Sequence, residues 1–250
     1  MELNLLFFAF AIPAVLFAGI SKGGFGSGAA FASTPLLAMI LEPGLAVGLM
    51  LPLLMVMDVT SLKPYWRKWH WPNAKVLILG AIPGTAVGAL IFSIANADMF
   101  RLMIGTVALG FVAYQGLRKA GLLAVKPKPF HPWNGGFWGF MTGITSFISH
   151  AGGPMVAVQL LSQDLSKTKY QATSVLVFWV ANWMKFFPYL LLGIMTPQTV
   201  WAGVILAPVA IIGTYLGVYA HRFLPERVYF TLTYTMLIIT GTKLFYDGLT

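Results

Sequence analysis

The stretch Gly19-Ile20-Ser21-Lys22-Gly23-Gly24-Phe25-Gly26-Ser27-Gly28 interrupts an otherwise apolar region and has a counterpart later in the chain. That counterpart begins at Gly143-Ile144-Thr145, 124 positions on (143 against 19), and ends in a second glycine cluster. Further matches at this offset are Leu36-Leu37 with Leu160-Leu161, Asp58 with Asn182, and Pro64-Tyr65 with Pro188-Tyr189. The sequence therefore predicts two related halves, 1–117 and 135–250, joined by a linker at 118–134.

The composition is that of a membrane protein. Of the 250 residues, 58% are hydrophobic and only 9% are charged, whereas soluble proteins carry about 25% charged residues. Apolar segments of spanning length recur along the chain. We expect helical segments at 3–20, 29–41, 45–61, 74–94 and 99–117, then at 135–148, 154–161, 170–192, 199–219 and 229–246. Each half thus has an interrupted pair followed by three transmembrane helices.

The basic residues are grouped in four loops. Residues 62–75, 117–134, 162–169 and 220–228 contain 12 of the 16 Lys and Arg residues, which places these loops in the cytoplasm by the positive-inside rule. Both termini are then periplasmic, and the two halves have opposite orientations. The predicted fold class is an all-α polytopic membrane protein with an inverted-topology two-fold repeat. Because the net charge of +9 is explained by orientation, nucleic acid is not expected as a partner.

The interrupted pairs are predicted to be re-entrant hairpins. Segments 29–41, 135–148 and 154–161 correspond to about 20 Å of helix or less, and the hydrocarbon core is about 30 Å thick. Two hairpin tips would then lie inside the membrane and present helix N-termini to an anion. The candidate binding residues at these tips are Gly26, Ser27, Gly28, Ser149, His150, Ala151, Gly152 and Gly153. The alternative for the glycines is close packing between helices.

Ionisable and amide side chains inside apolar segments are the other candidates. Lys22, Lys185 and Asn182 are candidate substrate-binding residues, and Asp58 is a candidate proton-coupling group. Each has a structural alternative: Lys22 can extend to the membrane surface, Asp58 can cap or pair helices, and Lys185 can pair with Asp58. His150 can instead pack between helices and bond a backbone carbonyl.

No catalytic or metal-binding constellation is evident. The four histidines are scattered without metal-ligand spacing, and the chain has no cysteine. We therefore expect no enzyme activity, no cofactor and no metal site.

Around both glycine clusters the chain resembles the TauE/SafE family of sulfite and organosulfonate exporters. The resemblance rests on residues 19–28 with Pro35-Leu36-Leu37, and on Gly139-Phe140-Met141-Thr142-Gly143 through His150-Ala151-Gly152-Gly153-Pro154. It implies export of small sulfur oxyanions, such as sulfite or sulfoacetate, across a bacterial inner membrane. The second tip departs from the first, since Ser149-His150 stand where Phe25-Gly26 stood.

The sequence thus predicts a secondary transporter that exports small sulfur-containing anions by alternating access, with the export direction implied by the resemblance alone. The alternatives are a passive anion channel, a transporter of other small organic anions, and a membrane scaffold without transport. The lipid bilayer is the expected surrounding. A homodimer and a coupled proton are left open.

Overall fold

The computed structural model describes residues 2–25, 30–123, 129–220 and 226–250. Within these ranges the chain is helical and contains no strand. The predicted residues Gly26, Ser27 and Gly28 lie outside the described residues.

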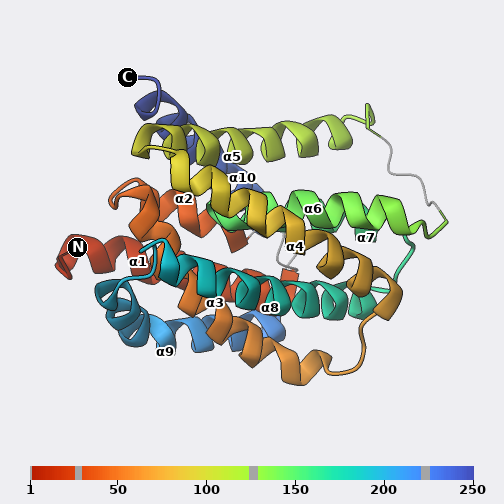
Figure 1. Cartoon of the computed structure of the whole chain (residues 1–250). Coiled ribbons are helices and arrows are strands. Elements are labelled where there is room, and N and C mark those ends of the chain that lie inside the picture. Colours follow the sequence, from red (N-terminus) through yellow and green to blue (C-terminus); the bar gives the residue numbers. More distant parts are fainter. Residues whose placement is uncertain (1, 26–29, 124–128, 221–225) are drawn as a thin grey trace.

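The described residues form ten α-helices and two short helical turns, which follow one another along the chain (Figure 1). The first half comprises α1 (Leu5–Ile20), a π-helical turn (Ser21–Phe25), a 3-10 turn (Ala30–Ala32), α2 (Ser33–Ala38), α3 (Pro43–Tyr65), α4 (Trp71–Ile94) and α5 (Ala97–Lys119). The second half comprises α6 (Pro132–Ser149), α7 (Gly153–Leu161), α8 (Lys167–Leu191), α9 (Pro197–Ala220) and α10 (Glu226–Asp247).

The helices agree with most of the predicted apolar segments. In segment 29–41 the α-helix covers only six residues, and two further differences were found. The first is that α6 has 18 residues, or about 27 Å, so the predicted limit of about 20 Å was wrong for this helix. Its earlier start has a simple cause: Pro132 occupies the first turn, where a missing N–H costs no hydrogen bond.

The second difference concerns which helices are long and apolar enough to cross a membrane. Six described segments qualify by length and composition: Leu5–Gly24, Pro43–Tyr65, Trp71–Ile94, Ala97–Lys119, Lys167–Leu191 and Pro197–Tyr219. Five of these were predicted as single crossings. The sixth is the first helix, which was predicted as one arm of an interrupted pair, whereas α10 does not qualify.

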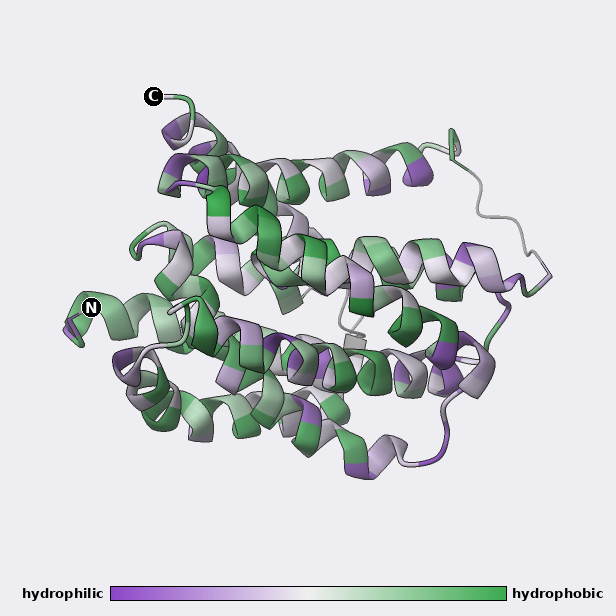
Figure 2. Ribbon diagram, in the orientation of Figure 1, coloured by the Kyte–Doolittle hydropathy of each residue, from purple (hydrophilic) through white to green (hydrophobic). Residues whose placement is uncertain are grey.

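The two ends of the bundle hold different connections. Both termini lie at one end of the bundle, and the α3–α4 and α7–α8 connections lie at the other (Figure 1). The hydrophilic colouring in Figure 2 is concentrated near these ends, while the middle of the helices is mostly apolar. In the same views α1 starts at the end that holds the termini, whereas α6 starts at the opposite end.

Helices from the two halves are packed against each other. The most extensive helix contacts join α4 to α6, α1 to α9 and α5 to α10, and α3 packs on both α8 and α9. Glycines allow the first two crossings. An added Cβ at Gly143 of α6 would lie 2.5 Å from Ala81 O, and one at Gly23 would lie 2.1 Å from Thr214 O. Gly23 therefore serves close packing between helices, because its backbone lies directly against the backbone of α9 at Thr214.

A pair of matched hydrogen bonds ties α3 and α8 to the two helix breaks. Tyr65 at the end of α3 donates to Gly23 O at 3.1 Å, and Tyr189 near the end of α8 donates to Phe147 O at 2.5 Å. In each bond, the donor residue and the acceptor residue are 42 positions apart in the sequence. The two bonds are also related to each other by the 124-residue offset (Tyr189 against Tyr65). The two bonds therefore join residues at equivalent positions of the predicted repeat.

Candidate functional site

The first helix break positions Lys22 deep in the protein. The π-helical turn after α1 is a form often found at functional sites. Lys22 is only 5% exposed, so the alternative in which it extends to the membrane surface is wrong. Its backbone carbonyl accepts a hydrogen bond from Gln171 Nε2 of α8 at 2.8 Å, which fixes the turn against the second half.

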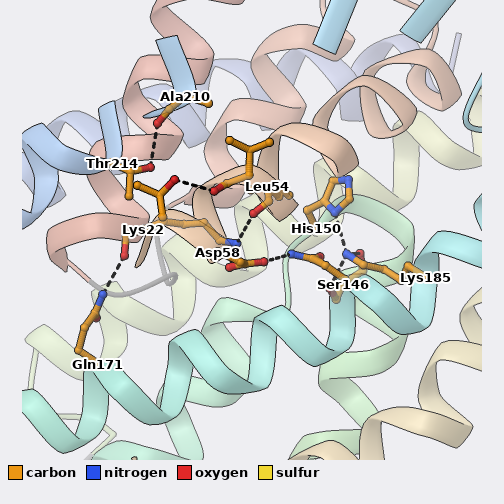
Figure 3. Close-up of polar contacts among 12 residues, drawn as sticks. Lys22, Leu54, Asp58, Ser146, His150, Gln171, Lys185, Ala210 and Thr214 are labelled. Carbon is orange, nitrogen blue, oxygen red and sulfur yellow. Dashed lines mark hydrogen bonds and ion pairs between the residues drawn. The ribbon is translucent and has the colours of Figure 1, made fainter. Parts of the chain in front are cut away.

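Lys22 forms an ion pair with Asp58 of α3 (Figure 3). Its ammonium group also donates to Leu54 O at 3.2 Å. The other carboxylate oxygen of Asp58 accepts from Asn182 Nδ2 of α8 at 2.5 Å. Asp58 and Asn182, which occupy the same position in the two repeats, thus contact each other directly in the core.

The second helix break is formed around His150. This residue terminates α6 in the left-handed conformation, with φ of 56°, where a glycine is usual and histidine is tolerated. The chain then turns at Ala151 and Gly152 into α7. An added Cβ at Gly152 would approach Ser146 Cβ and Phe178 Cε1 at 3.0 Å each, so the turn is closely packed.

Lys185 of α8 meets this second break. Its ammonium group donates to Ser146 O at 3.1 Å and Ser146 Oγ at 3.0 Å, and it lies 2.8 Å from His150 Nδ1. The opposite ring nitrogen of His150 lies 2.9 Å from Val47 O of α3. A carbonyl oxygen can only accept, so Nε2 carries the proton and Nδ1 accepts from Lys185. The prediction that Lys185 pairs with Asp58 is therefore wrong, because Lys22 fills that place.

These two breaks enclose a very small cavity of about 10 Å³. Its lining residues are Lys22, Ala30, Phe31, Leu54, Ser146, His150, Phe178, Asn182 and Lys185. Such a volume is at the lower limit for one water molecule. The cluster of two lysines, one histidine and one asparagine is therefore closed in this conformation.

A larger cavity of about 440 Å³ is lined by residues of α5, α7, α8 and α10 and of the α7–α8 connection. Gly24 and Gln171 line it beside the Lys22 turn, and Arg118 and Lys167 line it near the helix ends. We call this cavity the vestibule. Gln171 both lines the vestibule and bonds Lys22 O, and the turn that holds Gly24 and Lys22 contributes to the lining of both cavities.

The structure gathers five of the predicted residues into one cluster: Lys22, Asp58, His150, Asn182 and Lys185. The others have mainly backbone or packing positions. Ser149 donates to Thr145 O within its own helix at 3.3 Å, Ala151 is fully buried in an apolar cluster, and Gly153 begins α7. In the first half α2 starts only at Ser33 and has six residues, so no long helix begins at the first tip.

Two serines of the site were missed, although the repeat could have revealed them. Ser146 occupies the position of Lys22, and Ser61 occupies that of Lys185, at the same offset of 124 (146 against 22, 185 against 61). Each half therefore supplies one lysine and one serine. In the first half the lysine is at the helix break and the serine on α3, whereas in the second half the serine is at the helix break and the lysine on α8. Ser61 is 1% exposed, and its hydroxyl has no hydrogen-bond partner among the described residues.

Within the described residues, no group of three or more acidic or histidine side chains is arranged to hold a metal ion. The cluster thus offers ammonium, amide, imidazole and hydroxyl groups around a closed space. These are groups that bind an anion by charge and hydrogen bonding.

Comparison with known proteins agrees with this chemistry. Residues 11–244 match the family described as "Sulfite exporter TauE/SafE", whereas the curated proteins and the solved structures gave no match. The match covers nearly the whole chain, including both helix breaks and all five clustered residues. The family is one of transporters, and the apolar helices make this a multi-pass membrane protein. The chain belongs to the sulfite exporter TauE/SafE family.

Proposed function

We propose that this protein is a secondary transporter that exports small sulfur-containing anions, such as sulfite or an organosulfonate, across the inner membrane by alternating access. The observation that carries the proposal is Lys185, which is 1% exposed. Its ammonium group contacts a carbonyl, a hydroxyl and an imidazole, but no carboxylate among the described residues. An uncompensated buried cation is costly, so an anion that binds beside it recovers electrostatic free energy.

The proposed binding site is the small closed cavity. Lys22, Lys185, His150, Asn182 and Ser146 line it and supply charge and hydrogen-bond donors. Gly26, Ser27 and Gly28, together with the turn from Ser149 to Gly153, complete the site in this proposal. Because the cavity holds at most about one water, anion binding requires the two helix breaks to move apart.

The vestibule supports access from the cytoplasmic side. Its lining includes Gly24 of the Lys22 turn and three charged residues, Arg118, Lys167 and Asp164, whose net positive charge attracts anions. Export then begins with binding from the vestibule. A rearrangement of the helix breaks next opens the cavity toward the periplasm, as is common in transporters with broken helices.

The inverted repeat and the orientation are part of the same proposal. The matched bonds of Tyr65 and Tyr189 and the contact between Asp58 and Asn182 support a two-fold repeat. The opposite starting ends of α1 and α6 (Figure 1) support its inversion. With the basic loops in the cytoplasm, both termini are periplasmic.

Counterflow in proteoliposomes tests the proposal. Vesicles that contain the purified protein and unlabelled sulfoacetate are expected to accumulate labelled sulfoacetate transiently, with saturation, since a carrier exchanges bound substrate. A passive channel gives no transient accumulation. Lys185→Met should abolish exchange, because it removes the uncompensated cation while keeping a similar volume.

The matched control is Lys243→Met, which removes a lysine from an exposed ion pair with Asp247. It should exchange at the wild-type rate. If Lys185→Met exchanges sulfoacetate as fast as the wild type, the cluster does not take part in transport. If sulfonates and sulfite fail to exchange while carboxylates do so, the proposed substrate class is wrong.

A further inference from the structure

We propose that the closed cluster distinguishes anions by charge: it binds a monoanion without a proton, and it binds a dianion only together with one proton taken up by Asp58. This inference rests on the proposed function and specifies the substrate class and the coupled ion of the same site.

The resting charge of the cluster follows from its contacts. Lys22 and Asp58 form a buried ion pair whose charges cancel. The Lys185 ammonium has three N–H donors and three acceptors around it: Ser146 O, Ser146 Oγ and His150 Nδ1. His150 is neutral because Nδ1 accepts. With Lys185 protonated, the cluster carries one net positive charge, located on Lys185.

Among the described residues, the titratable groups that line the cluster are Lys22, Asp58, His150 and Lys185. The side chains that face Asp58 are Lys22 beyond α1, Asn182 of α8 and the neutral lining residues Ser61, Val175 and Phe178. Tyr65 and Tyr189 donate to backbone carbonyls. Asp98 and Asp247, two carboxylates with described side chains near helix ends, pair with Arg101 and Lys243. Asp58 is thus the one carboxylate available to a proton within the cluster.

Charge balance then separates the two kinds of anion. Electrostatic interactions are strong in a buried site, so the filled site is most stable when neutral. A monoanion neutralises Lys185 and leaves the Lys22–Asp58 pair intact. A dianion leaves one excess negative charge unless Asp58 takes a proton from solvent. Protonation of Asp58 also frees Lys22 from its ion pair, so both ammonium groups can face the dianion while Asn182 still donates to Asp58.

The proton produces a defined pH dependence. The dianion complex contains one proton more than the free protein, so raising the pH weakens binding about tenfold for each pH unit. Monoanion binding takes up no proton and stays constant with pH. Methanesulfonate and sulfate are suitable probes, because the former remains a monoanion and the latter a dianion near neutral pH.

Isothermal titration calorimetry of the purified full chain in detergent tests the inference without any mutation. Titrations in two buffers of different ionisation enthalpy count the protons taken up on binding. We expect one proton for each sulfate and none for each methanesulfonate. Proton-free sulfate binding, proton uptake with methanesulfonate, or no sulfate binding even at acidic pH overturns the inference.

Variants locate the proton. Asp58→Asn removes the proton acceptor and leaves two ammonium groups, so sulfate binding should become independent of pH and free of proton uptake. The double variant Lys22→Met with Asp58→Asn removes the ion pair as a unit. It should retain methanesulfonate binding and bind sulfate at least tenfold more weakly than the wild type. This double variant replaces the single variant if the single variant fails to fold.

Asp247→Asn is the matched control, since it makes the same substitution in an exposed pair and should leave both proton counts unchanged. Persistent uptake of one proton with sulfate in Asp58→Asn shows that another group takes the proton and overturns the assignment. The proposed function has a separate failure: if methanesulfonate, sulfate, sulfite and sulfoacetate all fail to bind, the anion-transport proposal itself is wrong.

Discussion

At the residue scale, the cluster depends on a few side chains in unusual positions. His150 combines a left-handed backbone conformation with two side-chain contacts, one to Lys185 and one to Val47 O. A strained residue that bridges two elements often has a functional role. The roles of its backbone conformation and of its side chain can be tested separately, because glycine adopts the left-handed conformation readily but has no imidazole.

Replacing His150 by glycine is expected to abolish transport with little loss of stability. Glycine relieves about 1 kcal/mol of left-handed strain, which offsets part of the lost hydrogen bonds. Counterflow measures transport, and thermal unfolding in detergent measures stability. His150→Asn, which also tolerates this conformation, should recover part of the exchange. Full exchange by His150→Gly would show that the imidazole is only structural.

At the element scale, glycine-lined crossings hold the broken helices in place. The α4–α6 and α1–α9 contacts bring backbones together through Gly84, Gly143, Gly213 and Gly217. Helices in a membrane gain stability mainly from such close packing, because lipid and apolar side chains attract one another equally well. The crossings therefore set the position of each break relative to the other half.

The substitution Gly143→Ala is expected to destabilise the protein by about 1–3 kcal/mol. The added Cβ would lie 2.5 Å from Ala81 O and 2.6 Å from Thr85 N, so α4 and α6 must separate. Gly136→Ala on the same helix is the control, since nothing lies within 4 Å of its added Cβ. It should be neutral or stabilising by up to about 1 kcal/mol. Equal thermal unfolding of the two variants would contradict this account of the crossing.

At the scale of the whole molecule, the vestibule and the closed cluster define an inward-facing arrangement under the proposed orientation. The natural sequence contains no cysteine, so one introduced thiol reports one position. Leu161 lines the vestibule and is 40% exposed. Ile94, at the other end of the helices, is 73% exposed.

A membrane-impermeant thiol reagent should therefore label Leu161→Cys from the cytoplasmic side alone and Ile94→Cys from the periplasmic side alone. Sulfoacetate should change the labelling rate at Leu161→Cys, because alternating access opens and closes the vestibule, and should leave Ile94→Cys unchanged. Labelling in oppositely oriented vesicles measures this. The reverse sidedness would mean that the orientation derived from the basic loops is inverted.

The sequence allowed the fold and the candidate site to be predicted to different extents. The helices were found because hydropathy and charge are local properties, and their segment lengths are read directly from the chain. The five clustered residues were found because a polar or ionisable side chain in an apolar segment is rare. The two serines were missed because single serines are common in membrane helices, and only their alignment with Lys22 and Lys185 distinguishes them.

By itself, the sequence determined a helical membrane protein, and it predicted two related halves with a break near one end of each. It did not predict the ion pair between Lys22 and Asp58, because the two residues are 36 positions apart on different elements. Only the tertiary structure decided this pairing. The π-helical turn directs Lys22 toward α3, whereas α8 presents Lys185 to the end of α6. Such choices depend on how three helices cross, and that geometry is set by packing over the whole molecule.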